Sequence, residues 1–465
     1  MKKIFSITLF LLLTQIVYST IRNVPGTYST IQTAINACTN GDTVVVAAGT
    51  YFENINFRGK KIVVTSTYYL SNNPSIINST IINGSTPVYP DTGTCVMFNN
   101  SEDSTVVLQG FSITGGTGTK WHDEHSSGTY REGGGILIQY SSPVIQNNII
   151  YNNLVTDITG VVSTGGGGMR IGDSYPRIYN NVVMNNTGRY GAGIVLNYSG
   201  CIMKNNLICN NFGSFQYGAG SGLWINNNFS QPRLIQNNTI VNNSATSGTG
   251  GINLYNSSET GTLRNNIVWG NTPTQMQGGS SLTITYCDFQ GGITGAGNIN
   301  VNPLFSDTNF VLSSTSPCVD AGDSSTIYND PEDPLNPGHG KYPSRGTLRN
   351  DMGAYGGPGR LLLSAALIGV KRISKNAPVN YALYQNYPNP FNPATTINFQ
   401  LPESGNVKLK VYDIEGKVVK TLVDANLTSG LYRAEFDGSN LASGVYFYKL
   451  ETENFSLTRK MMIVK

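Results

Sequence analysis

Short apolar segments alternate with Gly and Asn in a repeating order between residues 133 and 271. Five units begin with GGGILIQ, GGGGMRI, GAGIVLN, GSGLWIN and TGGINLY, and each carries an Asn pair near its centre. The second Asn of these pairs is, in turn, Asn148, Asn181, Asn206, Asn238 and Asn266. Near-regular spacing of this kind predicts stacked supersecondary units.

Within each unit the apolar side chains alternate with a period of two, which is typical of β-strands. Three short strands per unit, separated by polar corners, predict a right-handed parallel β-helix. Asn suits the corners because it tolerates left-handed backbone torsions. Stacked Asn side chains would also bond from coil to coil, as amide ladders do in cross-β stacks. Loops inserted at one corner, such as 114–132 and 155–164, would explain the uneven spacing.

The segment 24–66 is predicted to form the N-terminal cap and the first coils. One short amphipathic helix is expected there, with Ile31, Ala34, Ile35 and Cys38 on one face. Ser29 or Thr30 would cap its first turn. This helix would cover the open end of the first coil, where exposed strand edges otherwise invite aggregation.

Composition narrows the class of protein. The 465 residues include 53 Gly, only 12% are charged, and the net charge is +3. A nucleic-acid partner is not expected, because that needs a clustered basic face. The hydrophobic share of 39% argues against disorder, and the abundance of Gly argues against a helix-rich fold.

The N-terminus predicts export. Residues 1–20 have a basic start, an apolar core over 4–13 and small residues near a cleavage site, as signal peptides do. That core is shorter than the ~20 residues of a membrane span. We therefore expect an exported, monomeric mature chain without a transmembrane segment.

Six cysteines, at 38, 95, 201, 209, 287 and 318, remain after cleavage. An oxidising destination permits disulfides, but six cysteines allow 15 pairings. Pairing and burial as small hydrophobic residues both stay open.

Several strings resemble bacterial secreted β-helix proteins of the pectin-lyase-like superfamily. They are GDTVVVAAGTYFENINF (41–57, within the cap region), the coil GFSITGG, the Asn pairs, SPCVDAGD and DMGAYGG. The resemblance covers residues 21–358 and implies the fold. It leaves the activity open, because the superfamily includes lyases, hydrolases, epimerases and non-catalytic surface proteins.

A second pattern follows a predicted linker at 359–379. Residues 380–465 alternate as antiparallel strands with tight turns, which predicts a small immunoglobulin-like β-sandwich and makes the whole chain all-β. NYPNPFNPATTI, VKLKVYDIEGKVVKTL, LASGVYFYKL and the terminal TRKMMIVK closely resemble the C-terminal sorting domain of type IX secretion substrates. That resemblance implies export through the periplasm and outer membrane by the type IX machinery. Removal by its sorting protease would follow, and then surface attachment or release.

The strand that follows the glycines should carry outward side chains in ladders. One outward row runs through Arg170 and Trp224, and the next contains Gln139, Asn197, Asn226 and Tyr255. Aromatic faces and amides suit sugars, so these residues predict a polysaccharide groove: Trp224, Tyr255, Asn197, Asn226 and Gln139. The alternative is that inserted loops cover Trp224.

Three further groups are candidates for chemistry. Arg170 with Asp173 could serve a polysaccharide lyase, which needs a base and a positive charge against the uronate. The loop 120–132 could hang over the groove as an acid/base loop or metal clip, or be merely solvated. Its titratable groups are Lys120, His122, Asp123, Glu124, His125, Arg131 and Glu132. Asp320, Asp323 and Asp351 could hold calcium, or could bond the backbone of an irregular loop.

These observations support two hypotheses. The first is an exported β-helix protein that binds polysaccharide and cleaves it as a lyase or a hydrolase. The second is a non-catalytic cell-surface adhesin or structural module.

Overall fold

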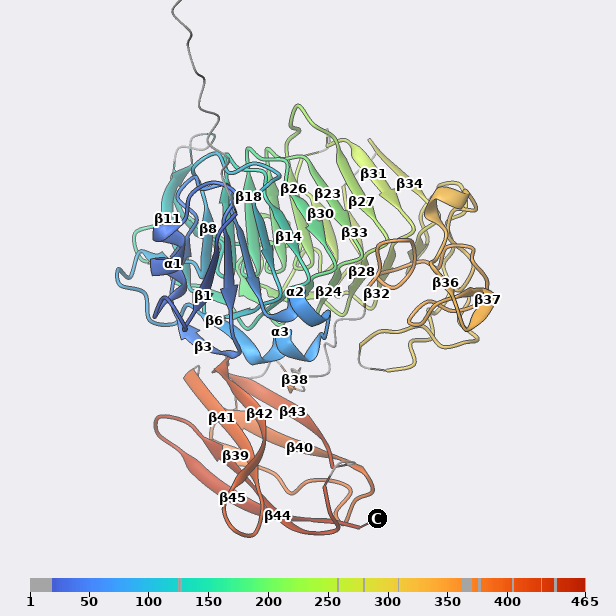
Figure 1. The fold of residues 1–465 in the computed structure, drawn as a ribbon. Helices are drawn as coiled ribbons and strands as arrows, with labels where there is room; N and C mark the ends of the chain where they lie inside the picture. The colour runs from blue at the N-terminus through green and yellow to red at the C-terminus, as the bar shows by residue number, and fades with distance from the viewer. Residues whose placement is uncertain are drawn as a thin grey trace, which may run out of the picture.

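The computed structural model describes residues 19–123, 125, 128–256, 259–278, 281–307, 309–361, 370–374, 378–403, 405–427, 429–438 and 441–464. The predicted signal peptide therefore lies outside the described residues, apart from its last two positions. The chain forms a stack of parallel coils followed by small antiparallel sheets, as the sequence predicted (Figure 1).

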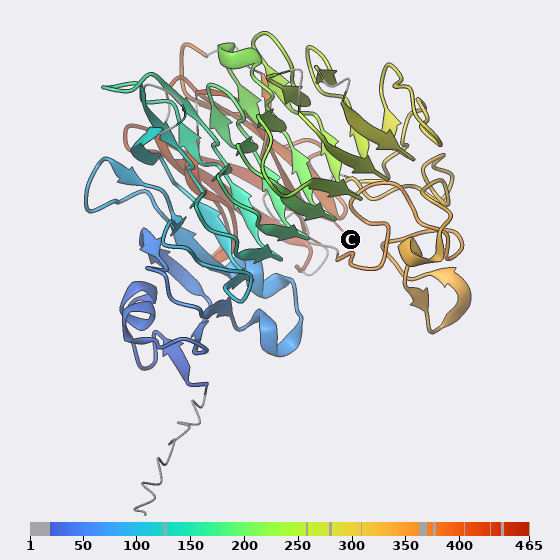
Figure 2. The same ribbon diagram turned by 90° about the horizontal axis from the view of Figure 1, so that it is seen from above.

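Three parallel sheets run the length of the stack (Figure 2). Sheet A contains β1 (Ile21–Val24), β2 (Thr43–Val46), β5 (Val63–Ser66), β9 (Val107–Gln109), β14 (Val144–Gln146), β19 (Arg177–Tyr179), β23 (Cys201–Lys204), β27 (Arg233–Gln236), β31 (Gly261–Arg264) and β34 (Leu282–Thr285). Sheet B contains β3 (Gly49–Phe52), β6 (Thr80–Asn83), β10 (Ser112–Thr114), β15 (Ile149–Tyr151), β20 (Val182–Met184), β24 (Leu207–Cys209), β28 (Thr239–Val241), β32 (Ile267–Trp269) and β35 (Asp288–Phe289). Sheet C contains β4 (Ile55–Asn56), β8 (Val96–Phe98), β13 (Ile136–Gln139), β18 (Met169–Gly172), β22 (Ile194–Asn197), β26 (Leu223–Asn226), β30 (Ile252–Leu254) and β33 (Met276–Gln277).

The register of sheet C matches the repeat alignment. Ile136 pairs with Met169, Met169 with Ile194, Ile194 with Leu223, and Leu223 with Ile252. All five side chains point inward and are fully buried. Because successive strand residues face opposite sides, this register also aligns the outward positions in rows.

The two asparagines of each pair have different roles at the corners between sheets A and B. The first Asn of each pair has a left-handed backbone, as at Asn205 with a φ of 58°. The second Asn points inward and joins a ladder from Asn148 to Asn266. Asn206, for example, donates to Asn238 Oδ1 at 2.9 Å and accepts from Asn181 Nδ2 at 3.1 Å. A second ladder runs from Asn153 through Asn186, Asn211 and Asn243 to Asn271. The coil-to-coil bonding predicted from the Asn pairs is thus confirmed.

The helix predicted at the N-terminal cap is α1 (Ile31–Ala37). Thr30 caps it through a reciprocal pair of bonds with Thr33, and Glu53 accepts from the amides of Ile31 and Gln32 at 2.9 Å. Its buried face packs into the core of the first coils. The remaining short helices are α2 (Tyr68–Ser71), α3 (Ser75–Ser79), η1 (Gln216–Gly218) and η2 (Thr326–Tyr328).

Three small sheets accompany the three long ones. The cover sheet, as we call it, contains β7 (Thr92–Gly93), β11 (Gly118–Asp123), β12 (Gly128–Glu132) and β17 (Ser163–Gly165). A corner sheet contains β16 (Leu154–Val155), β21 (Thr187–Gly188), β25 (Phe212–Gly213) and β29 (Ser244–Ala245). Beyond the last coil, β36 (Glu332–Asp333) pairs with β37 (Asn336–Gly340).

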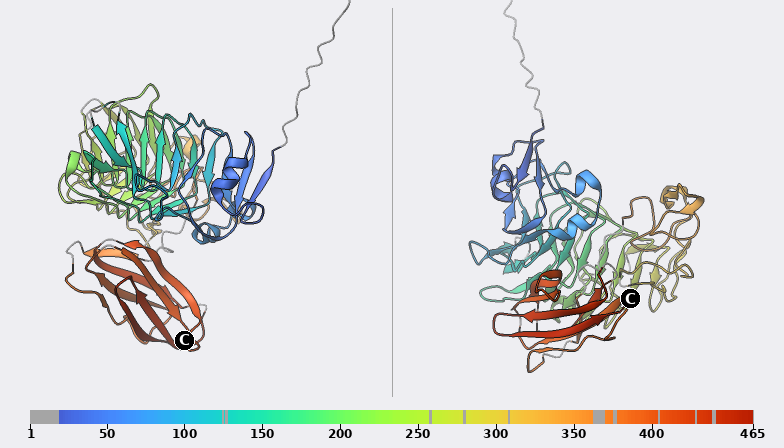
Figure 3. Two further views of the ribbon diagram at one scale, coloured as in Figure 1. Left: turned by 90° about the vertical axis from the view of Figure 1, so that its left-hand side faces the viewer. Right: turned by 60° about the horizontal axis from the view of Figure 1, so that its bottom comes forward.

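The C-terminal region forms two antiparallel sheets that are separate from the coils (Figure 3). One contains β38 (Val370–Ser374), β39 (Ala382–Leu383), β40 (Ala394–Leu401) and β43 (Gly430–Asp437). The other contains β41 (Gly405–Tyr412), β42 (Val418–Leu427), β44 (Gly444–Glu451) and β45 (Ser456–Ile463). Strand β38 lies inside the segment that the sequence predicted as linker. The buried Tyr448 hydroxyl donates to Tyr384 O and accepts from Asn386 N, which ties the start of this region to its core.

No disulfide joins the six cysteines, all of which belong to the described chain and are buried. Burial raises the pKa of Cys95, Cys201 and Cys287 to about 12. They therefore remain neutral thiols that pack as small hydrophobic side chains, which is one of the two alternatives that the sequence left open.

Candidate functional site

The hairpin β11–β12 folds across the outer face of sheet C and creates a cleft. Trp121 pairs with Tyr130 in the hairpin, so side chains on alternate positions face the sheet. The cleft has a volume of about 200 Å³. It is lined by Asp123, His125, Tyr130, Tyr190, Asn197, Tyr198, Tyr217, Trp224, Asn226 and Tyr255.

Arg170 is the centre of a buried network beneath the hairpin. It points outward from β18 as predicted, but its side chain is fully covered. Its Nε lies 3.2 Å from Glu132 Oε2, and its guanidinium stacks 4.1 Å from the ring centroid of Trp121. Trp121 Nε1 donates to the same Glu132 oxygen at 3.0 Å. Arg170 thus anchors the hairpin to the sheet and does not reach the cleft.

Two neighbours complete this network. Gln139 accepts from Arg170 Nη1, and the Tyr190 hydroxyl donates to Glu132 Oε1. Burial and the Glu132 carboxylate raise the pKa of Tyr190 well above its usual range, so the hydroxyl stays protonated. Glu132 compensates the charge of Arg170. The network therefore supports the cleft from beneath but places no unpaired positive charge in it.

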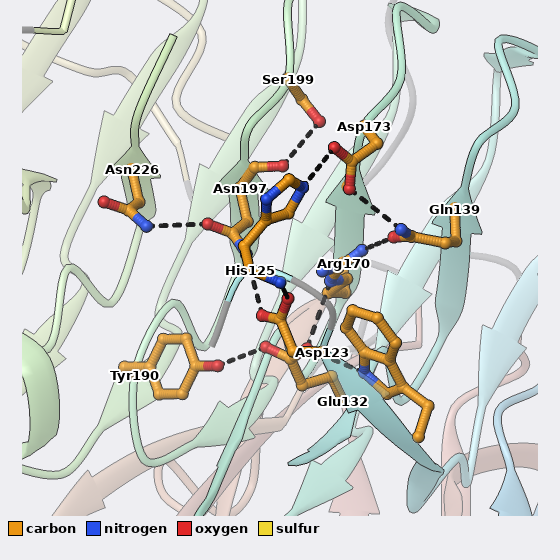
Figure 4. A network of polar contacts seen from close by, with 12 residues as sticks. Asp123, His125, Glu132, Gln139, Arg170, Asp173, Tyr190, Asn197, Ser199 and Asn226 are labelled. Atoms are coloured by element: carbon orange, nitrogen blue, oxygen red, sulfur yellow. Dashed lines mark hydrogen bonds and ion pairs between the residues drawn. The ribbon is translucent and has the colours of Figure 1, made fainter. Parts of the chain in front are cut away.

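His125 and Asp173 form a pair at the edge of the cleft (Figure 4). His125 Nε2 lies 2.7 Å from Asp173 Oδ1, while Asp173 Oδ2 accepts from Gln139 Nε2 at 3.0 Å. The imidazole stacks on Tyr198 with ring centroids 3.8 Å apart. The sequence paired Asp173 with Arg170, but in the structure Asp173 partners His125 and Arg170 partners Glu132.

Asp173 and Tyr198 occupy the corner that follows sheet C, each with a left-handed φ of 48°. The other corners place Asn at such positions, as at Asn180 and Asn205. A left-handed backbone costs most residues roughly 1–2 kcal/mol. The same corner also holds Tyr140 and Asn227, with φ of 52° and 54°, so this backbone conformation recurs from coil to coil and places Asp173 and Tyr198 at equivalent positions.

A second cluster of polar side chains lies along the second outward row of sheet C. Asn197 Nδ2 donates to Asp123 Oδ2 at 3.2 Å, and Asn226 Nδ2 donates to Asn197 Oδ1 at 2.8 Å. Asp123 Oδ1 also accepts from the His125 amide at 3.0 Å. This chain of amides brings Asn197 and Asn226, both predicted from the ladder, next to a carboxylate of the hairpin.

Aromatic rings form the opposite wall. Trp224 is 5% exposed and donates its Nε1 to Tyr217 O at 2.9 Å, so it is largely covered by the loop around η1. Its ring lies 5.3 Å from that of Tyr255, which is 48% exposed. The alternative that loops cover Trp224 is therefore correct for most of this ring, whereas Tyr255 offers its face to solvent.

The remaining loop candidates lie away from the cleft. Arg131 is buried and pairs with Asp91 at 2.7 Å and with Asp157 at 3.6 Å. Lys120 and His122 alternate with Trp121 and Asp123 along β11 and thus project from the other face of the hairpin. Glu124 lies outside the described residues.

The acidic residues in the loops that follow the last coil accept hydrogen bonds from backbone amides. Asp320 accepts from Thr347 N at 3.0 Å, and Asp351 accepts from the amides of Asp320 and Arg345 at 2.8 Å. Asp323 pairs with Arg264 at 3.3 Å. Within the described chain no three His, Cys, Asp or Glu side chains are grouped to hold a metal ion. The calcium prediction thus lacks a ligand group there.

Sequence reasoning included Asp123 only as one of the titratable groups of the loop 120–132, and it missed four cleft residues altogether: Tyr130, Tyr190, Tyr198 and Tyr217. Asp123 stands two positions before His125 in the loop that was singled out, and Tyr198 directly follows Asn197. Tyr217 belongs to the aromatic insertion FGSFQYG, whose position over the sheet has no repeat to predict it.

Comparison with protein families identifies a domain in the C-terminal part of the chain. Residues 385–465 match the model of the secretion system C-terminal sorting domain. Neither the curated proteins nor the solved structures give a match. The sorting domain indicates secretion across the outer membrane, to the cell surface or outside, and implies interaction with the type IX machinery. None of the helices in the described chain is long and apolar enough to cross a membrane.

Proposed function

We propose that this exported β-helix protein binds an uncharged polysaccharide in the cleft over sheet C. The observation that carries the proposal is the composition of the cleft wall. Tyr255 presents an aromatic face beside the amides of Asn226 and Asn197 and the carboxylate of Asp123. Apolar ring faces with a few placed hydrogen-bonding groups are the usual lining of small-molecule sites, and sugars present a matching apolar face and hydroxyl rim.

Charge favours a neutral glycan over a uronate. The lining residues include Asp123 and His125 but neither Lys nor Arg among the described positions. Arg170, the cation expected to face a uronate, is fully buried against Glu132. A lyase needs positive charge against the substrate carboxylate, so the lining does not support β-elimination.

Hydrolysis is the second candidate, because glycosidases use paired carboxylates. Asp123 and Asp173 are both bonded to His125, one through its amide and one through its ring. A binding-only adhesin uses the same cleft without turnover.

Calorimetric titration of the full secreted chain with xylan, glucomannan, laminarin and polygalacturonate tests the proposal. We expect a neutral polymer to bind, and polygalacturonate to bind more weakly. Preferential binding of polygalacturonate, or no binding of any neutral polymer, would contradict it. Incubation of the bound polymer, followed by an assay for new reducing ends, separates a hydrolase from an adhesin.

A further inference from the structure

The cleft is closed at one end. The hairpin residues Asp123, His125 and Tyr130 line it on the side of β18. Past them, the outward side chains of β13 and β18 are covered: Leu137 is 5% exposed and Arg170 is fully buried. A larger hollow of about 490 Å³ lies further toward the N-terminal coils, but it shares no lining residue with the cleft. The hairpin therefore interrupts the outer face of sheet C.

The opposite end is open. Along the second outward row, exposure rises from Gln139 at 6% and Asn197 at 8% to Tyr255 at 48%. Asn226 is half-buried between them. On the next strand, β33, Gln277 pairs with Asn253 of the first outward row and is exposed. A ligand that enters past Tyr255 meets increasing burial until it reaches the hairpin.

The closed end carries the hydrogen-bonding chemistry. Asp123 holds carboxylate oxygens there, and the His125 ring and Asp173 form the rim. The open end carries the exposed aromatic face of Tyr255. At about 200 Å³ the cleft is smaller than the ~300 Å³ at the low end of drug-sized sites, so it suits a short terminal segment.

We propose that the cleft recognises the end of a glycan chain. The terminal sugar lies against Asp123 and His125, and the rest of the chain leaves over Tyr255. This inference rests on the proposed function and specifies its binding mode. An internal segment of a long chain would have to pass through the hairpin, which the buried Arg170–Glu132–Trp121 network holds against the sheet.

Calorimetry with length-matched neutral ligands distinguishes end recognition from internal recognition. Xylohexaose with xylan, mannohexaose with mannan and laminarihexaose with laminarin provide the pairs. End recognition predicts one site per chain and a dissociation constant per chain that agrees within about twofold between hexasaccharide and polymer. Blocking one particular end of the hexasaccharide should weaken binding by about tenfold or more.

Internal recognition predicts the opposite pattern. Several protein molecules would then bind each polymer chain, and neither blocked end would matter; that result overturns chain-end binding and leaves glycan binding intact. If none of these ligands binds, the proposed function fails and the chain-end inference fails with it.

The variant His125→Ala tests the end wall itself. Its imidazole stacks on Tyr198 at the surface of the cleft, so the substitution should leave the coils folded. In this variant, blocking the end of the hexasaccharide should weaken binding less than in the wild-type protein, because removal of the imidazole leaves room for the blocking group. His339→Ala is the matched control, because His339 lies on β37, beyond the last coil, and bonds Gly346 O. An unchanged end preference in His125→Ala would contradict the assignment of the wall.

Discussion

The interior ladders and the cleft over sheet C both place asparagine amides on neighbouring strands or corners, yet they differ in what their polar atoms contact. Asn206 is fully buried, and the chain itself satisfies its side chain: the amide donates to Ile178 O and to Asn238 Oδ1, and the oxygen accepts from Asn181. In the cleft, Asn226 and Tyr255 keep part of their surface in contact with solvent. The presence of polar side chains therefore does not by itself indicate a binding site. Polar groups that remain accessible to solvent do.

Arg170 shows how easily the two kinds of region are confused. By its register it belongs to the outward row of the groove, but its environment is that of the interior. Substitutions can separate the groups that stabilise the fold from the groups that face a ligand.

The largest effect is expected for Arg170→Ala. This change leaves Glu132 as a buried, uncompensated charge, which typically costs about 3–5 kcal/mol of unfolding free energy. Because the hairpin loses its anchor, glycan binding should disappear as well. Urea unfolding and calorimetry of the variant, with the half-buried Arg177→Ala as control, check this; a stable variant that merely loses turnover would instead make Arg170 a catalytic residue.

Asn206→Ala should destabilise the coils by about 3 kcal/mol, because it leaves several buried ladder partners without hydrogen bonds. The affinity of the remaining folded protein for glycan should not change. The control Asn99→Ala, at an exposed position, should stay within about 0.5 kcal/mol. Equal destabilisation by both variants would show that the ladder is no more important than surface asparagines.

The acidic residues after the last coil predict a pH dependence. Burial raises the pKa of Asp330 to about 8, with the Asp351 charge adding to the rise, and burial raises that of Asp351 to about 7. Unfolded aspartate titrates near ~3.9, so between pH 5 and 8 the folded chain holds a proton that the unfolded chain has released. Stability should therefore fall as the pH rises, by about 1.4 kcal/mol per pH unit for each such proton.

Urea unfolding at pH 5, 6, 7 and 8 measures this slope. Asp288, whose pKa burial raises to about 6, acts in the same direction. Asp42, whose pKa is lowered to about 2 by hydrogen bonds from Thr39, Thr20 and Arg22, loses its contribution only at lower pH. The variant Asp330→Asn should flatten the slope; stability that rises with pH in the wild-type protein would contradict the assignment.

The smallest free-energy change and the sharpest test of the cleft is Tyr255→Ala. We expect about tenfold weaker glycan binding, or ~1.4 kcal/mol, because the exposed aromatic face is lost. Unfolding free energy should fall by about 1 kcal/mol at most, since Tyr255 is half exposed and its ring contacts Trp224. Tyr342→Ala, an equally exposed tyrosine beyond the last coil, is the control. Equal affinities in the two variants would remove Tyr255 from the binding surface.

Much of the fold could be predicted because its signals are local and repeated. Alternation in ILI, MRI and LWI determines which side chains enter the core, and each Asn pair recurs at the same corner. The structure adds that the first Asn takes the left-handed backbone and the second forms the ladder. The cap helix followed from four apolar positions and one capping Thr.

The candidate site could be predicted only in part. Strand alternation placed Asn197, Asn226 and Tyr255 on one outer face, and the structure brings all three to the cleft. The partners of Asp173 and Arg170 could not be predicted, because Glu132 and His125 come from a hairpin about 40 residues away that belongs to no repeat.

By itself, then, the sequence determined the coil stack, its register and the sorting domain, because short-period patterns and contiguous motifs specify them. Only the tertiary structure decided which outward side chains reach solvent. Burial of an outward position depends on where the inserted loops fold, and those loops are positioned by long-range contacts such as Arg170 with Glu132. A change in one such contact would alter the accessible surface of the cleft while leaving the repeat pattern as it is.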